Sequence, residues 1–529
     1  MVSAPVADAL LNPPHALAAL FHPAAPLPAF PAVVAAHFAA LFDPPAAFAN
    51  IPALNVLHPP QLFSKNALVA FRAVVQDTSP SPSIYLAKSP ANTPGGWGLS
   101  VPDLQDPDPA HLAQCTVLWA TSVPGESLWC TRQSTNLYQE NQNGVSPNPT
   151  HPHKFPLPAT SHIGVQVKIY DSTLADALKP SDLTTFVGIL TKEPFFSQDF
   201  ESSAEIDDVP TLHVLFARPT PPTIIPRTFP ATFTPSQLKT TRDALLTWIA
   251  DESLGGDTHA AEWVLLSAIA RTHSRTPPVY PPSLTLSSFP APSDATAKPT
   301  LSHILSLLLP ITCTLPLSLN TINETPFCPE SKNEDLHSGW LQVPQGTLYL
   351  LTESGITEGS VRNKGLENLR AVQDMMNGQT LDYVFPFSRF TFPTDVSFLV
   401  LAEGKKSAFF QTSNNVTLKP RSGMEFDLFK PLDKIRVPDE EVLEQWRDFI
   451  GGSKIGTVTI EDGTAQYIQD DFVNERKIAQ GKGSAMTSDD LINRMITARL
   501  LALSYHETLV TRDVWEKTKA LETEKKSRI

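Results

Sequence analysis

Cysteine is scarce in this chain, which contains only Cys115, Cys130, Cys313 and Cys328. No two of them form a Cys-x-x-Cys pair, which a zinc ribbon needs, and a secreted disulfide scaffold would need a far higher cysteine density. We therefore expect the four thiols to be buried and reduced, in an intracellular protein.

Glycine and positive charge are also sparse. The chain has 23 Gly against 51 Pro, and 40 Lys and Arg against 54 Asp and Glu, which gives a net charge of −14. The prolines predict many stiff connections. The negative balance disfavours tight, non-specific binding to a polyanion, because such binding needs clustered Lys and Arg.

The chain also lacks an apolar run that predicts a membrane span. Its most apolar window, 301–319, contains His303, Pro310 and Pro316, and predicts a buried helix followed by a turn. The first Lys or Arg is Lys65, and prolines cut the apolar stretches before it. We therefore expect neither a signal peptide nor a membrane role.

The first 60 residues are rich in Ala, Pro and Phe. Residues 7–11 and 33–42 have the apolar content and propensity of two short helices packed on a neighbour. A partly ordered, low-complexity arm is the alternative for this segment.

Residues 62–218 contain short β-rich runs separated by turns. They predict a small antiparallel barrel or sandwich, and their order is compatible with an OB-like barrel. Two inserts, the polar 133–160 and the acidic 196–209, are expected to be solvated loops. The expected strands are 68–76, 83–87, 115–120, 163–170, 182–190 and 211–217.

Helices appear after the proline-rich segment 219–235, which predicts a stiff linker. Residues 236–251 predict a helix capped by Ser236, and 257–271 predict a second helix. Helices alternate with buried strands up to about residue 419, which is an α/β pattern. The later expected helices are 440–450, 470–480, 488–504 and 511–521.

The segment 348–353 resembles the Walker B strand of a ring ATPase without its metal-binding aspartate. Its apolar run leads into Thr352-Glu353, where such a strand carries Asp-Glu. The neutral hydroxyl of Thr352 is a poor Mg²⁺ ligand. A second predicted strand ends in Glu403-Gly404, where such a motor presents a polar sensor residue. The pattern indicates that the ATPase scaffold is retained and that its catalytic residues are missing.

The nearest approach to a phosphate-binding loop is Gly404-Lys405-Lys406-Ser407. The loop motif needs a Gly five residues before Gly404, but position 399 is Leu. We therefore expect a basic turn here. Without the loop, the Walker B Asp and the sensor, hydrolysis of ATP by the usual mechanism has no route, and we expect no ATPase activity.

The turn at 125–129 is one residue short of a nucleophile elbow. Trp129 fills the second Gly position of that motif, and the sequence shows no strand-to-helix context around it. A β-turn inside the barrel is therefore expected, with Ser127 as an ordinary turn residue.

Two groups of histidines and acids raise the question of a metal. Asp257, His259 and Glu262 lack the i, i+4 spacing of a helical zinc pair, and Asp257 is expected to cap a helix instead. His151 and His153 lie in a proline-rich loop and are expected to be solvated. The sequence thus predicts no catalytic, no cofactor-binding and no metal-binding residue.

These patterns, together with the resemblance to a ring ATPase, imply a multidomain chain of mixed α and β class, in which an OB-like β-barrel precedes a degenerate AAA+-like α/β domain with a C-terminal helical lid. A length of 529 residues is too great for one core, and 41% hydrophobic residues with 28 Phe supply sizeable ones. The expected regions are a helical segment 1–60, the OB-like domain 62–218, the linker 219–235, the AAA+-like domain 236–435 and the lid-like domain 436–529.

The chain resembles the minichromosome maintenance (MCM) complex-binding protein family, and a fungal member in particular. Residues 490–499 and 510–514 are similar to the helical lid of an MCM motor, although residues 485–488 lack the arginine with which such a lid senses nucleotide. The motifs that carry the family resemblance are 71–77, 123–129, 212–217, 256–266, 338–353 and 379–383.

The resemblance implies a nuclear, non-enzymatic protein that binds MCM helicase subunits as an adaptor or chaperone in DNA replication. It also implies a role in the release of MCM complexes from chromatin and in sister chromatid cohesion. No cofactor, no small-molecule substrate and no membrane partner is expected. Residues 525–528 are too short to be taken as a nuclear signal.

Single-stranded nucleic-acid binding by the barrel is the alternative function. It needs exposed aromatic side chains flanked by Lys and Arg. Core and turn packing is the better account of most aromatics in the barrel, and the basic residues are scattered, so direct binding is disfavoured. The aromatics in question are Tyr85, Trp97, Trp119, Trp129 and Tyr138.

Overall fold

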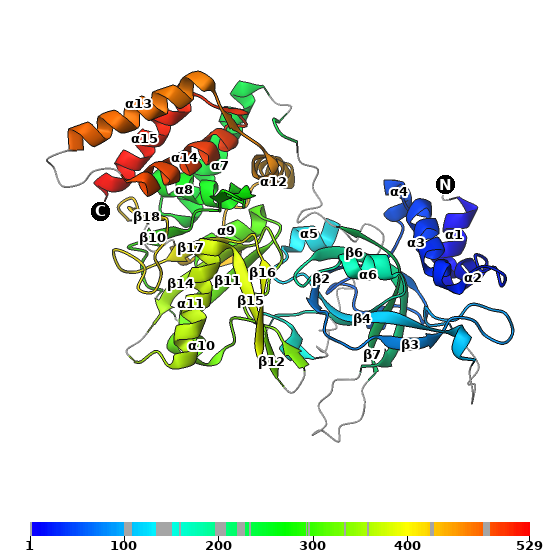
Figure 1. Cartoon of the computed structure of the whole chain (residues 1–529). Coiled ribbons are helices and arrows are strands. Elements are labelled where there is room, and N and C mark those ends of the chain that lie inside the picture. Colours follow the sequence, from blue (N-terminus) through cyan, green and yellow to red (C-terminus); the bar gives the residue numbers. More distant parts are fainter. Residues whose placement is uncertain are drawn as a thin grey trace. The chain divides into compact units, whose positions relative to one another are not determined.

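The computed structural model of the chain (Figure 1) forms two compact units of mixed α and β structure, which confirms the predicted class. The N-terminal unit comprises Met1–Ile224, Pro326–Gln345 and Leu381–Phe392. The C-terminal unit comprises Ile225–Thr325, Gly346–Thr380 and Pro393–Ile529. The structure describes residues 3–99, 108–133, 151–157, 160–195, 208–219, 228–231, 234–292, 294, 297–332, 335–356, 359–423, 428–479 and 487–528.

The N-terminal unit is built on a sheet that closes on itself. Its strand order is β1-β2-β6-β7-β5-β4-β3, and β2 also pairs with β4, so five of the strands form a ring. Within the ring β5 and β7 are parallel and the other pairs are antiparallel. All six predicted strands are confirmed. The strands are β1 (Ala53–Leu54), β2 (Leu68–Asp77), β3 (Ser83–Leu86), β4 (Leu112–Ser122), β5 (Gly164–Ile169), β6 (Leu183–Pro194) and β7 (Asp208–Pro219).

Alternation along β2 explains how the closed sheet is covered on both sides. Val69, Phe71 and Val75 belong to one buried cluster with residues of the other ring strands. Leu68 and Ala70, which point to the opposite face, pack with the N-terminal helices. The described part of the first 60 residues is therefore mostly helical and packed on a neighbour, which agrees with one of the two alternatives. Those helices are α1 (Ala4–Leu11), α2 (Pro13–Ala18), α3 (Phe30–Leu41) and α4 (Pro45–Phe48).

Two segments expected in the α/β region belong to the N-terminal unit, as part of a small second sheet of order β13-β12-β15-β16. The amide of Gln342 donates to the carbonyl of Gln76 at 2.7 Å and to the Tyr383 hydroxyl at 2.9 Å. This buried network ties both segments to strand β2. The strands are β12 (Glu330–Lys332), β13 (Asp335–His337), β15 (Thr380–Phe385) and β16 (Ser388–Pro393).

The C-terminal unit contains a five-stranded sheet in which every pair of neighbours is parallel. Its order is β11-β14-β17-β10-β18. The three inner strands β14, β17 and β10 are buried along nearly their whole length, as parallel strands covered on both faces require, whereas burial is interrupted along the edge strands β11 and β18. The predicted helix in the window 301–319 is confirmed, but a strand follows it where a turn was expected. The strands are β10 (Leu284–Ser287), β11 (Thr312–Ser318), β14 (Leu348–Gly355), β17 (Ser397–Leu401) and β18 (Asn414–Thr417).

Helices pack on this sheet, and one large core joins the strands β10, β14, β17 and β18 to helices that precede and follow them in the chain. The sequence placed the first helix cap wrongly: the side chain of Thr234, not Ser236, caps α7 in a capping box with Gln237. The helices include α7 (Pro235–Ser253), α8 (Thr258–Ile269), α9 (Thr300–Leu308), α10 (Leu319–Glu324), α11 (Asn363–Gly378), α12 (Glu440–Ile455), α13 (Asp462–Ala479), α14 (Ser488–Ser504) and α15 (Arg512–Ser527). Among the described residues, no helix combines the length and the apolar character that crossing a membrane requires.

The cysteines behave largely as predicted. Cys115, Cys130 and Cys313 are buried free thiols, and Cys328 is a half-buried one. The inserts at 133–160 and 196–209 lie mostly outside the described residues, except for a short stretch at 151–157 and the edges of the neighbouring elements.

Candidate functional site

The two residues at the Walker B position lie near the C-terminal end of strand β14. Thr352 and Glu353 are buried, with 5% and 7% of their surface exposed. The Glu353 carboxylate accepts hydrogen bonds from the Ser407 hydroxyl at 2.5 Å and from the backbone N–H of Ala408 at 3.0 Å. Burial raises the pKa of Glu353 above its usual value, although the bond from Ser407 opposes that shift. The carboxylate is thus held by the protein itself.

The basic turn predicted at 404–407 is confirmed. Gly404, Lys405 and Lys406 are exposed in a series of bends after β17. The next element is strand β18, and residues 402–413, all of which the structure describes, contain no helix. A phosphate-binding loop would instead have to run from a strand into the start of a helix, where the helix dipole favours the anion.

A strand–loop–helix connection does exist in this sheet, at a position where the sequence contains no phosphate-loop motif. Strand β10 lies between β17 and β18 and is followed by helix α9. The connecting sequence, 288–299, contains no Gly and has proline at positions 290, 292 and 299. Proline has no backbone N–H to offer a phosphate, and without Gly the backbone cannot approach one closely. Lys298 lies just before the helix, where a phosphate-binding loop carries its lysine, and is the one residue here that resembles that motif.

The possible metal group on helix α8 is dispersed into separate structural contacts. Asp257 caps the helix by accepting from the N–H of Ala260 at 3.1 Å, which confirms that prediction. His259 pairs with Glu524 at 3.1 Å, and Glu262 pairs with Arg242. The three side chains therefore serve packing within the C-terminal unit.

The turn before Trp129 differs from its prediction in one respect. A short helix, α5 (Leu128–Gln133), follows β4 and the turn, so a strand-to-helix context is present and the prediction that it is absent is wrong. Ser127 is nevertheless buried, with 4% of its surface exposed, whereas a nucleophile elbow displays its serine. The absence of the second Gly remains the argument against an elbow.

The closed sheet offers little of what single-stranded nucleic acid needs. Trp97 and Trp119 are buried in the core, as predicted, with 1% and 0% of their surface exposed. Tyr138 lies outside the described residues. Several of the scattered cations have internal partners: Arg72 pairs with Glu126, and Lys168 pairs with Glu193 at 2.5 Å.

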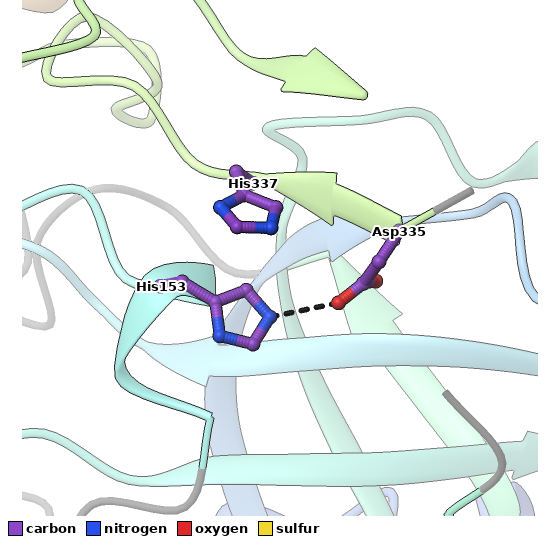
Figure 2. A group of neighbouring side chains, drawn as sticks. All are labelled: His153, Asp335 and His337. Atoms are coloured by element: carbon purple, nitrogen blue, oxygen red, sulfur yellow. Dashed lines mark hydrogen bonds and ion pairs between the residues drawn. The ribbon is translucent and has the colours of Figure 1, made fainter. Parts of the chain in front are cut away.

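One cluster of titratable side chains that the sequence did not predict forms in the N-terminal unit. Figure 2 shows His153, Asp335 and His337 pointing toward one another. The Nε2 atom of His153 lies 2.7 Å from Oδ2 of Asp335, and the two imidazole rings have centroids 4.4 Å apart. His153 is therefore a half-buried, hydrogen-bonded side chain with 32% of its surface exposed, and the prediction of a solvated histidine is wrong.

Backbone geometry explains how these three side chains meet. Asp335 and His337 are two residues apart on strand β13, so their side chains project from the same face. His153 lies in the single 3₁₀ turn η4 (Pro152–Lys154). Because 182 residues separate His153 from Asp335, no local pattern could have joined them. The Asp-x-His pair at period two is the one sequence signal that pointed here.

A buried lysine, Lys154, contacts the carboxylate of this cluster from the interior of the unit. Its side chain is fully buried, and Nζ donates to Oδ2 of Asp77 at 2.8 Å, to Oδ1 of Asp335 and to the carbonyl of Leu336 at 3.3 Å. Burial alone would raise the pKa of Asp335, but the bond from His153 and the charge of Lys154 hold that pKa well below its usual range. Burial, reinforced by the neighbouring His153, lowers the pKa of His337.

Comparison with known proteins gives one consistent result. The model of the family described as "Mini-chromosome maintenance replisome factor" matches residues 130–529. The mini-chromosome maintenance complex-binding protein of Arabidopsis thaliana is 28% identical over an alignment of 400 residues that covers 70% of this chain and 64% of that protein. The proteins of the same name from Danio rerio and Homo sapiens are 28% and 25% identical, over 71% and 77% of this chain and 63% and 68% of their own lengths. The chain thus spans about two thirds of the length of these relatives.

Proposed function

Because the chain belongs to the mini-chromosome maintenance replisome factor family, we propose that it is a non-enzymatic protein that binds the MCM helicase complex. The observation that carries this proposal is the family match over residues 130–529, together with relatives named as MCM complex-binding proteins. The matched range includes the whole described sheet of the C-terminal unit and, in the N-terminal unit, strands β5, β6 and β7 of the closed sheet.

The C-terminal unit supports a degenerate AAA+-like interpretation. Its strands are parallel, so the ends of β10, β14 and β17 lie along one edge, which is where α/β proteins bind nucleotides. At that edge the chain has a proline-rich loop without Gly, then Thr352 in place of the metal-binding aspartate, and an exposed Glu403 in place of the sensor. An ATPase scaffold with these substitutions is suited to contact rather than to turnover.

The N-terminal unit supports the OB-like part of the same interpretation. A closed ring of five strands with one parallel pair and a short helix between β5 and β6, α6 (Ser172–Ala177), is compatible with an OB-like barrel. A chain that combines such a barrel with a degenerate motor unit would share its architecture with the helicase subunits that it resembles. It could then make the contacts that neighbouring subunits of the ring make with one another.

This shared architecture favours an adaptor or chaperone of MCM subunits in DNA replication. Action in the nucleus, release of MCM complexes from chromatin and support of sister chromatid cohesion are the cellular roles that we propose with it. The alternative, direct binding of single-stranded nucleic acid, is disfavoured by the buried tryptophans and the internally paired cations of the barrel.

Co-elution with purified MCM subunits tests the proposal. The full chain is mixed with each subunit in turn at micromolar concentration, and complexes are identified by size-exclusion chromatography with light scattering. We expect a stable complex with at least one subunit, and the same complex without added nucleotide. The proposal fails if every subunit elutes separately from the chain.

A further inference from the structure

We propose that His153, Asp335 and His337 form a binding site for a divalent transition-metal ion, with Zn²⁺ as the best match. Two imidazole nitrogens and one carboxylate oxygen form a donor set that Zn²⁺ accepts, and three protein ligands leave one position of a tetrahedral ion for water. Mg²⁺ and Ca²⁺ prefer sites made of oxygen alone. The inference is independent of the proposed function, because it rests on this cluster only.

The donor atoms are already close to the spacing that such an ion needs. One ligand atom from each residue lies within 4.8 Å of the other two. Zn–N and Zn–O bonds of about 2.0–2.2 Å place neighbouring ligand atoms of a tetrahedral ion roughly 3.3–3.6 Å apart. The 2.7 Å distance between Nε2 of His153 and Oδ2 of Asp335 would therefore lengthen slightly when the ion replaces the proton of their hydrogen bond. Any pair of ligand atoms near the 4.8 Å limit would have to move closer together.

The surroundings of Asp335 match the outer shell of a metal site. A carboxylate that binds a metal through one oxygen is usually held by a hydrogen bond at the other oxygen. Lys154 provides that bond at Oδ1, which leaves Oδ2 directed at the two histidines. Lys154 is itself fixed by Asp77, whose Oδ1 also accepts from the backbone N–H of Ser79 at 2.8 Å.

The charge balance around the cluster also favours a cation. Two carboxylates, Asp77 and Asp335, surround one ammonium, Lys154, all of them buried. The net charge of this group before a metal binds is negative, so Lys154 orients the ligand without cancelling its attraction for a positive ion. His153 keeps 32% of its surface exposed, which gives an ion and its water a route from solvent.

A bound ion would connect two distant parts of the N-terminal unit. It would join the turn η4 to strand β13 across 182 residues of sequence. The segment that carries β13 returns to this unit from the α/β region. The ion would therefore stabilise the attachment of this returning segment, because a ligand that binds only the folded state favours that state.

The test is a titration of the full chain, purified in the presence of a chelator and then freed of it, with Zn²⁺ in a calorimeter. We expect one Zn²⁺ per chain with sub-micromolar affinity, no binding of Mg²⁺, and visible d–d absorption bands when Co²⁺ is used instead. Failure of the wild-type chain to bind Zn²⁺ would overturn the proposal.

Variants separate metal binding from simple ring packing. His337→Phe keeps an aromatic ring against His153 but removes its donor nitrogen, so packing alone predicts no change in Zn²⁺ binding. We expect the affinity to fall by more than the roughly 10- to 100-fold that loss of an outer-shell partner costs. His153→Gln should cause a similar loss, and His111→Phe, a half-exposed histidine outside the cluster, should cause none.

Folding of each variant is verified by circular dichroism before titration. If His337→Phe does not fold, His337→Gln takes its place, since it also lacks an imidazole. Zn²⁺ binding of wild-type strength in the folded variants at position 337 and in His153→Gln would refute the site.

Discussion

Removal of the Lys154 ammonium is expected to destabilise the N-terminal unit strongly. Lys154→Met keeps the length and apolar stem of the side chain but leaves Asp77 and Asp335 without their cation, at 1% and 9% exposure. Breaking a buried ion pair by removing one partner typically costs about 3–5 kcal/mol, because the remaining charge stays buried without compensation. A loss of that size is a large fraction of the stability of an ordinary domain.

The assay is urea denaturation of the full chain in a chelator, so that no metal contributes. Hydrogen exchange, read out by mass spectrometry on peptides from strand β2 and from strand β13, assigns the loss to the N-terminal unit. Lys192→Met is the matched control, since Lys192 is exposed on β6 and its loss is expected to change the free energy of unfolding by less than about 0.5 kcal/mol.

A double-mutant cycle identifies the cause of the loss. Asp335→Asn removes one of the two carboxylates that Lys154→Met leaves without a cation. In the Asp335→Asn background, Lys154→Met should therefore lower the free energy of unfolding clearly less than it does in the wild-type chain. Equal costs in both backgrounds, or a cost below about 1 kcal/mol in the wild-type chain, would show that Lys154 is not the counter-charge that holds this cluster together.

Three further outcomes are expected. Asp257→Ala should lower the free energy of unfolding of the C-terminal unit by more than the ~1 kcal/mol of a lost helix cap, because Asp257 also binds Arg528 at 2.7 Å; a smaller loss in thermal denaturation would contradict this. Burial alone would raise the pKa of Glu193, but the bonds from His213 and then from Lys168 lower that pKa to about 2. The contribution of Glu193 to the free energy of unfolding should therefore be complete above its unfolded-state pKa of about 4.3 and decline as the pH falls toward 2. Glu193→Gln should reduce this loss of stability in acid. Thr352→Asp should not create ATP turnover, measured as phosphate release, because the connection 288–299 still lacks a glycine and contains three prolines.

Local patterns predicted most of the elements. The strands of the closed sheet follow from short apolar and β-branched runs, and Asp257 was identified as a cap from its position before an apolar helical stripe. The small error at α7 has a local cause as well: Thr234 precedes a proline, which is favoured as the first residue of a helix, and Gln237 completes the capping box.

The cluster at His153 and the placement of two returning segments depended on contacts that no periodicity encodes. Gln342 reaches Gln76 across 266 residues, and this bond helps to assign 326–345 to the N-terminal unit. Lys154 looked like one of many scattered surface cations, because sequence does not reveal that two carboxylates from distant strands neutralise it. Side chains of this kind are found only when the fold brings them together.

We propose that this chain binds MCM subunits through protein contacts and without nucleotide chemistry. The most direct measurement is the dissociation constant between the immobilised full chain and nuclease-treated MCM subunits, with and without ATP. We expect saturable binding to at least one subunit that persists after nuclease treatment and does not require ATP. Binding that disappears with the nucleic acid, or that needs hydrolysis of ATP by this chain, would contradict it.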